Sequence, residues 1–141
     1  MDFIINNVTH IRVRYADTDK MGIVYNGNYF TFFEVGRTEL MRAHGLPYVT
    51  FENEGYLLPL IEAHANYKAS AFYDDVLEIN SSINLDQIGA TVVFNYVINC
   101  GDRFIADGYT KHSFVKSDTM KPVRPPAFFK EFINKLKNNL S

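Results

Sequence analysis

One helical segment followed only by strand segments limits the folds that are open to this chain. Over Asn28–His44 the apolar residues recur with the period of an α-helix and gather on one face. Gly45 and Pro47 come directly after this segment and are typical of a helix end. An apolar helix face needs a partner surface, and the segments around this helix offer a sheet. The residues of the face are Tyr29, Phe32, Phe33, Gly36, Leu40 and Met41.

The glycine on this face is informative, because Gly36 lies where a helix interior normally disfavours glycine. Glycine in such a position costs about 1 kcal/mol relative to alanine. We expect a compensation: with no side chain at Gly36, the helix is able to approach a sheet closely at this point.

Strand segments occupy most of the remaining chain. The alternation of apolar and polar residues over His10–Tyr15 predicts a strand before the helix. Four further strands are expected after it, joined by short polar turns and therefore antiparallel. They are predicted over Leu57–Ala71, Val76–Leu85, Ala90–Cys100 and Phe104–Lys116. A short amphipathic helix is expected over Ala127–Leu140. The expected fold class is α+β, with a helix lying on an antiparallel sheet.

Length, composition and residue spacing argue against several classes of function. A length of 141 residues predicts a single domain over residues 1–141, and a net charge of −2 gives no basic field for nucleic acid. Cys100 is the only cysteine, so no internal disulfide is possible, and a cytoplasmic location is expected. The start lacks the pattern of a secretory signal, and no apolar run approaches the roughly 20 residues of a membrane span. The four histidines have no metal-ligand spacing, so no metal site is predicted.

Two carboxylates stand between the first strand and the helix. Asp17 and Asp19 precede a glycine turn over 21–23, and the helix start follows this turn. The first turn of a helix has unpaired N–H donors and a partial positive potential. A carboxylate that acts as base or nucleophile and a fixed N–H donor are the parts needed to hydrolyse an activated acyl group. The simpler alternative for either acid is a turn or capping role.

The pattern around the two acids extends along the chain as a longer motif. Its residues are Tyr15-Ala16-Asp17-Thr18-Asp19, Gly22-Ile23-Val24-Tyr25, Tyr29, Phe33-Glu34, Gly36-Arg37-Thr38-Glu39, Tyr67, Asp74-Asp75-Val76-Leu77, Lys121-Pro122 and Pro125. On these residues the chain resembles the 4-hydroxybenzoyl-CoA thioesterase-like family of hotdog-fold acyl-CoA thioesterases over essentially its whole length. The resemblance implies a hotdog fold, in which a curved five-stranded antiparallel sheet wraps a long central helix. It also implies that subunits pair and that active sites form at their interface.

The resemblance further implies a cofactor-free hydrolysis of acyl-CoA to a carboxylic acid and CoA. It puts the catalytic carboxylate at Asp19, acting as nucleophile or as general base. For Asp17, a structural turn acid is the expected role, and a share in the site with Asp19 is the alternative. The resemblance puts the main-chain N–H that polarises the thioester carbonyl at Asn26. Many relatives carry a histidine there, and an asparagine cannot shuttle protons near neutral pH. The residues expected to border the substrate are Tyr15, Gly22, Val24, Tyr25 and Glu34.

Alternatives stay open at this point. Asp19 and Asn26 could each be a turn or cap residue, and the tyrosines could serve packing alone. An ion pair with Arg37 is the simpler role for Glu34. The thiol carrier could be an acyl-carrier protein instead of CoA, and the chain could be a non-catalytic module that binds acyl thioesters. The partners expected from the resemblance are acyl-CoA and further copies of the chain, as a homodimer or homotetramer, with neither nucleic acid nor membrane.

Overall fold

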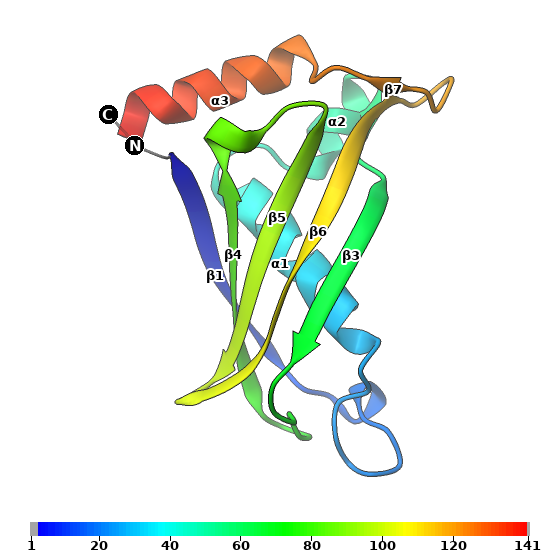
Figure 1. Cartoon of the computed structure of the whole chain (residues 1–141), viewed down its shortest axis with the longest axis vertical. Coiled ribbons are helices and arrows are strands. Elements are labelled where there is room, and N and C mark those ends of the chain that lie inside the picture. Colours follow the sequence, from blue (N-terminus) through cyan, green and yellow to red (C-terminus); the bar gives the residue numbers. More distant parts are fainter. Residues whose placement is uncertain (1–2, 141) are drawn as a thin grey trace.

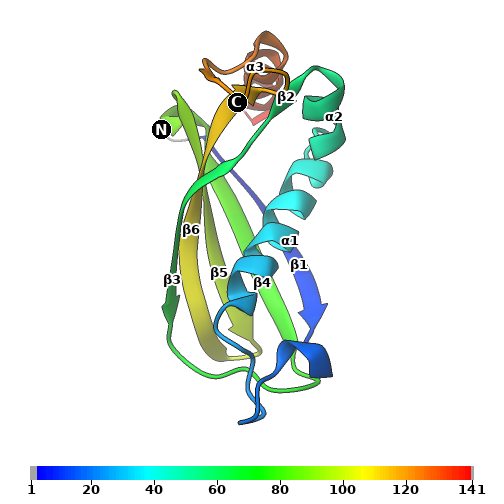
Figure 2. The same ribbon diagram turned by 90° about the vertical axis from the view of Figure 1, so that its right-hand side faces the viewer.

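The computed structural model describes residues 3–140 and consists of a curved antiparallel sheet with a long helix, α1 (Asn28–Ala43), against its concave face (Figures 1 and 2). A second long helix, α3 (Ala127–Leu140), crosses one end of the sheet (Figure 1). The other elements are β1 (Ile4–Arg12), α2 (Tyr48–Asn53), β2 (Tyr56–Leu57), β3 (Leu60–Tyr67), β4 (Val76–Asn84), β5 (Thr91–Cys100), β6 (Arg103–Lys116) and β7 (Pro122–Val123), with single 3-10 turns over Tyr15–Asp17 and Leu85–Gln87.

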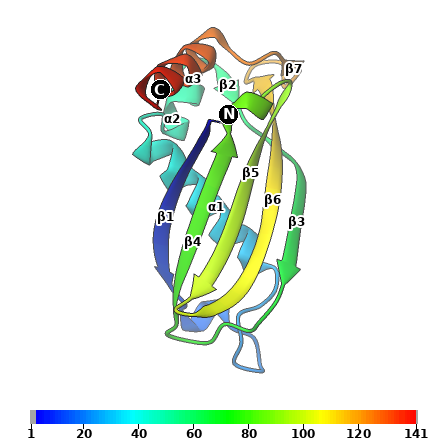
Figure 3. The ribbon, with the colours of Figure 1, turned by 60° about the vertical axis from the view of Figure 1, so that its left-hand side comes forward.

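The five long strands lie in the order β1-β4-β5-β6-β3 (Figure 3). The longest strand, β6, pairs with β5 along one side and with β3 along the other. Its C-terminal end, around residues 114–116, pairs with the two-residue strands β2 and β7. Short turns join β4 to β5 and β5 to β6, as expected for antiparallel neighbours. The α+β hotdog expectation is confirmed, and β2 and β7 are additions to it.

The first strand differs from its prediction. It spans Ile4–Arg12 rather than His10–Tyr15, because its ladder with β4 begins at Ile4 opposite Asn84 and ends at Arg12 opposite Val76. The residues that follow do not extend the strand, since Tyr15–Asp17 forms a 3-10 turn.

The segment after α1 also differs from its prediction. The helix α2 was missed, because six residues after Pro47 are too few to show a helical period. The single strand expected over Leu57–Ala71 is two strands, β2 and β3, and it ends at Tyr67. The limits of the later strands and of α3 are as predicted to within one residue.

The contact of α1 with the sheet confirms the role expected for Gly36. The buried residues of α1 are the six that the helical period placed on one face. A Cβ atom built on Gly36 would lie 2.8 Å from Cγ2 of Ile79 and still closer to Oγ of Ser81, both on β4. Next to this point Phe33 stacks on Tyr96 with ring centroids 4.3 Å apart. The backbone of α1 therefore rests directly on β4.

A chain of hydrogen bonds between buried polar side chains crosses the core. The Tyr96 hydroxyl lies 2.6 Å from Oγ1 of Thr110, which lies 3.0 Å from Nε2 of His112. Nδ1 of His112 is 3.1 Å from the Leu58 carbonyl oxygen, which only accepts, so Nδ1 carries the proton and Nε2 accepts from Thr110. Burial lowers the pKa of His112 to about 4, and the nearby charge of Arg37 acts in the same direction. The imidazole is therefore neutral at physiological pH.

Replacing Gly36 by alanine tests the close approach. We expect Gly36→Ala to lower the free energy of unfolding by about 1–2 kcal/mol, because overpacking outweighs the gain in helix propensity. Urea unfolding measures this. The buried hydroxyl of Ser81 has no hydrogen-bond partner among residues 3–140, so Ser81→Ala alone should be nearly neutral. In that background Gly36→Ala should cost less, and equal costs in both backgrounds would contradict the contact.

The buried histidine predicts a pH dependence of stability. In the unfolded chain His112 takes up a proton at its ordinary pKa of 6.5. In the folded chain it does so only near pH 4. Stability is therefore lost as the pH falls through this window, by up to about 3 kcal/mol. His112→Gln should flatten this slope in urea unfolding series, whereas His10→Gln on the exposed side of β1 should keep it. An unchanged slope in His112→Gln would refute the assignment.

Candidate functional site

The loop between β1 and α1 carries the predicted acids and lies at the end of the molecule opposite α3 (Figure 1). A bridge between Thr18 and Val24 closes this loop upon itself. A second bridge, between Ile23 and Phe72, joins it to the segment that follows β3, and the Val24 N–H donates to the Ala71 carbonyl at 2.8 Å. Backbone hydrogen bonds thus fix the loop against the rest of the chain.

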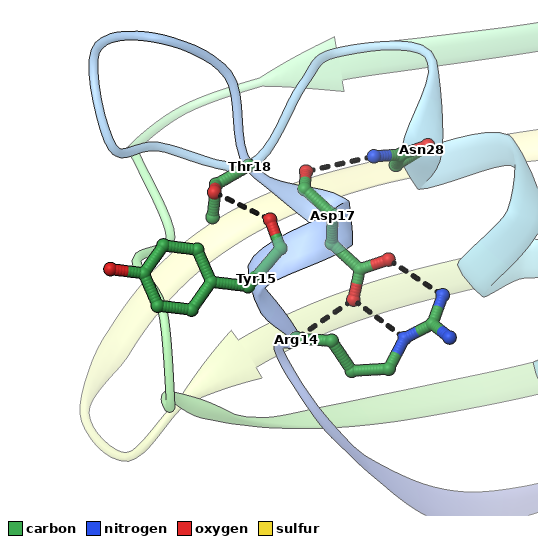
Figure 4. A network of polar contacts seen from close by, with 5 residues as sticks. All are labelled: Arg14, Tyr15, Asp17, Thr18 and Asn28. Atoms are coloured by element: carbon green, nitrogen blue, oxygen red, sulfur yellow. Dashed lines mark hydrogen bonds and ion pairs between the residues drawn. The ribbon is translucent and has the colours of Figure 1, made fainter.

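Asp17 holds the start of this loop (Figure 4). Its carboxylate accepts from the backbone N–H of Arg14 at 2.8 Å and forms an ion pair with the Arg14 guanidinium at 3.1 Å. Its carbonyl oxygen accepts from the Asn28 side chain at 2.8 Å and from the Tyr25 N–H at 2.9 Å. Burial acts to raise the pKa of Asp17, but the hydrogen bonds and charge of Arg14 outweigh it and hold that pKa below its usual value. The structure gives Asp17 the structural role expected for it.

Asp19 lies half-buried at the beginning of a tight turn. Its Oδ1 accepts from the Met21 N–H at 2.8 Å, and its backbone N–H donates to the Ile23 carbonyl at 2.9 Å. The Gly22 N–H closes the turn on the Asp19 carbonyl at 3.0 Å, with Gly22 at φ +79°, a conformation that favours glycine. One carboxylate oxygen therefore shapes the turn. The other, Oδ2, has no hydrogen-bond partner within residues 3–140.

Asn26 stands just before α1. Its side-chain oxygen accepts from the neighbouring Gly27 N–H at 3.0 Å and makes no capping bond further into the helix. Its carbonyl oxygen accepts from the Tyr67 hydroxyl at 3.0 Å and from the Tyr29 N–H at 3.3 Å. Over the described part of the chain the Asn26 N–H donates to no protein acceptor. It is an exposed donor at a helix start, where the local potential is positive.

A small cavity of about 120 Å³ opens beside Asn26, between the start of α1 and the end of β3. Of the predicted residues, Asn26 and the buried Val24 line it, but Asp19 does not. The other lining residues are Ile23, Tyr29, Tyr67, Ala69 and Ser70, which sequence reasoning did not place in the site. Tyr67 belongs to the motif, but no local pattern shows its contact with a residue 41 positions away.

Four predicted substrate residues do not line this cavity, and one of them is Gly22, which lies in the tight turn after Asp19. Tyr15 is 76% exposed and packs on Tyr73, with ring centroids 4.5 Å apart. Tyr25 is exposed beside the helix start. Glu34 borders a different hollow of about 340 Å³, further along α1. A single chain therefore does not gather these residues in one pocket.

The prediction of an ion pair between Glu34 and Arg37 is wrong. Among the ion pairs of residues 3–140, none joins these two side chains. Burial acts to lower the pKa of Arg37, but the hydroxyls of Tyr96 and Tyr48 beside it hold that pKa above its usual value. Arg37 therefore lies near the Tyr96 hydroxyl, which belongs to the buried polar chain.

Two further observations concern ligands and membranes. Within residues 3–140 no three histidine, cysteine or acidic side chains are placed to hold a metal ion. No helix in that range is long and apolar enough to cross a membrane.

Comparison with known proteins gives consistent matches. The family model of the thioesterase-like superfamily matches residues 13–133. An acyl-CoA thioesterase, YbgC, of Haemophilus influenzae is 31% identical over 128 residues, which span 90% of this chain and 93% of the relative. The structure of a DHNA-CoA thioesterase from Staphylococcus aureus superposes with a TM-score of 0.85 at 31% identity, over 96% of this chain and 91% of that one.

A more distant structure supports the fold alone. The 4-hydroxybenzoyl-CoA thioesterase of Pseudomonas sp. strain CBS-3 superposes with a TM-score of 0.79 at 22% identity, over 91% of this chain and 99% of that one. The family match covers residues 13–27 between β1 and α1, which form the acid loop, and then α1 and all strands that follow it. By fold and by sequence, the chain belongs to the thioesterase-like superfamily of hotdog proteins.

Proposed function

We propose that the chain is an acyl-CoA thioesterase that hydrolyses its substrate to a carboxylic acid and CoA. Membership of the superfamily and the activity of the Haemophilus influenzae relative support this. The observation that carries the proposal is a pair of unused groups in the acid loop. Oδ2 of Asp19 and the backbone N–H of Asn26 have no protein partner within residues 3–140, and the two residues flank the bridge between Thr18 and Val24.

These two groups divide the reaction between them. The Asn26 N–H donates to the thioester carbonyl oxygen and stabilises the negative charge that develops as the carbonyl carbon becomes tetrahedral. One donor of this kind contributes about 3 kcal/mol to transition-state stabilisation. Asp19 either attacks the carbonyl carbon and forms a mixed anhydride that water opens, or takes a proton from the attacking water. In both routes the thiolate of CoA leaves and takes up a proton.

A second copy of the chain is part of this proposal. The cavity beside Asn26 is small for an acyl group, because ligand pockets usually measure about 300 Å³ or more. The adjacent strand β3 pairs only with β6, so its other edge is open within the described chain. The side chains of β3 are exposed or half-buried on both faces, and Leu60 and Ile61 are about half exposed. We infer that two copies meet along β3 and close the site between them.

The opposite edge of the sheet suits pairing less well. α1 packs against β1, which therefore has buried residues on its inner face, such as Ile5. Of the exposed residues of β1, Asn6, His10 and Arg12 are polar or charged, and Ile4 and Val8 are apolar. Open edges with polar and charged side chains are protected against strand addition. The free edge beside the candidate site is therefore the favoured meeting surface.

Replacing Asp19 by asparagine tests the catalytic assignment. Asparagine keeps an oxygen that accepts from the Met21 N–H, so the turn and the melting temperature should be preserved. Thiol release from acyl-CoAs with short, long and aromatic acyl groups should fall by about 100-fold or more. Asp118→Asn, in the exposed turn after β6, is the matched control and should leave thiol release unchanged. Retained activity in Asp19→Asn would rule out the role of this acid.

Charge on β3 tests the meeting of two copies. Light scattering of the unmodified chain should give at least twice the 16.2 kDa of one chain. Ile61→Lys should shift the mass to that of one chain and lower thiol release with it, because the lysine would place a charge in the meeting surface, whereas in a single chain this side chain is 54% exposed. Val8→Lys, on the opposite edge of the sheet, should keep the larger mass. A single-chain mass for the unmodified protein would contradict the inference.

A further inference from the structure

The hydrogen bond between Tyr67 and Asn26 joins two parts of the chain that meet only in the folded state. Tyr67 is the last residue of β3, and its hydroxyl donates to the Asn26 carbonyl oxygen at 3.0 Å. The end of β3 and the start of α1 lie at the same end of the molecule (Figures 1 and 2). The bond thus ties the sheet edge to the residue whose N–H is the proposed oxyanion donor.

The tyrosine itself is held in place. Its ring packs edge-on against Tyr29 with centroids 5.3 Å apart, and both rings line the small cavity. The backbone that follows is also restrained, because Arg103 donates to the Ser70 carbonyl at 2.8 Å and pairs with Asp75 at 2.9 Å. The hydroxyl of Tyr67 therefore projects from a fixed frame rather than from a mobile loop.

Asn26 is anchored on both sides by these contacts. Before it, the Tyr25 N–H donates to the Asp17 carbonyl at 2.9 Å, and Asp17 is itself locked by Arg14. After it, the Asn26 carbonyl is held by Tyr67. With the preceding N–H and the following C=O both fixed, the dihedral angles of Asn26 have little freedom, and so the direction of its own N–H is set.

We propose that Tyr67 is a positioning residue for catalysis, whose hydroxyl holds the main chain of Asn26 so that its N–H points at the thioester carbonyl. This rests on the proposed thioesterase function. A donor of this kind contributes only when it is already oriented toward the developing charge. Tyr67 makes no covalent or proton-transfer step, and its ring would contact the acyl group only as part of the cavity wall.

Removing one oxygen atom tests the proposal. Tyr67→Phe keeps the ring against Tyr29 and loses only the hydrogen bond to Asn26. Because small misplacements of reacting groups can cost up to about 100-fold in rate, we expect kcat to fall by about tenfold, with KM changed by less than about twofold. Melting temperature and oligomeric mass should stay those of the unmodified protein.

The matched control makes the same chemical change elsewhere. The Tyr109 hydroxyl donates to Glu62 at 2.7 Å on β3 and β6, away from the acid loop. Tyr109→Phe should leave kcat and KM unchanged. An unchanged kcat in Tyr67→Phe would overturn the proposal, as would an equal loss of kcat in Tyr109→Phe. A loss that follows a lower melting temperature or a smaller oligomer would overturn it too.

A readout that does not depend on turnover separates this proposal from the thioesterase function. In ¹H–¹⁵N NMR spectra the amide resonance of Asn26 should shift in Tyr67→Phe and not in Tyr109→Phe, because only the first variant releases the Asn26 carbonyl from its side-chain donor. If the unmodified protein releases no thiol from any acyl-CoA, the proposed function fails while the amide result still reports the anchoring. If the Asn26 amide is unaffected, Tyr67 does not position it.

Discussion

The direct contact between the backbone of α1 and strand β4 at Gly36 is the constraint on which the rest of the structure depends. Any side chain at this position would overlap Ile79 and Ser81. With the helix seated there, its six buried residues fill the concave side of the sheet, and Phe33 stacks on Tyr96. The short distance between α1 and β4 at Gly36 also sets the position of the start of α1, where Asn26 contacts Tyr67 at the end of β3.

The helix lies off the centre of the sheet, and this asymmetry determines where chemistry is possible. α1 packs against β1 and β4 and makes few contacts with β3. One side of the sheet is therefore filled by the helix, whereas β3 keeps an open edge and exposed apolar side chains such as Ile61. The acid loop ends beside this uncovered strand. The proposed substrate site and the proposed meeting surface of two copies both lie on this less covered side of the sheet.

The two acids of the loop differ in what surrounds them, although they are only two residues apart. The carboxylate of Asp17 accepts hydrogen bonds from Arg14, and its carbonyl oxygen accepts one from Asn28 at the start of α1. Asp17 is therefore a fixed part of the loop. One carboxylate oxygen of Asp19 accepts from the Met21 N–H in the turn, and the other has no protein partner within residues 3–140. The loop thus contains one acid that anchors the backbone and one acid with an oxygen free of protein partners within residues 3–140, and this difference supports the proposal of Asp19 as the catalytic carboxylate.

The elements set by local patterns were predictable from the sequence. The buried face of α1, the close approach at Gly36, the limits of β4, β5, β6 and α3, and the α+β class all follow from periodicity and turn residues. The start of β1 was not predictable, because it depends on the partner strand β4, and α2 was too short to show a period.

For the candidate site, the sequence by itself determined which acid loop and which helix start stand together, since these are neighbours along the chain. Only the tertiary structure decided that Arg14 forms an ion pair with Asp17, whereas one oxygen of Asp19 has no protein partner within residues 3–140. The hydrogen bond from Tyr67 to Asn26 was likewise decided there. It also decided that Tyr15 and Glu34 lie away from the cavity of Asn26. The physical reason is range: periodicity and turn chemistry act over a few residues, whereas these contacts arise only after the sheet and helix have packed.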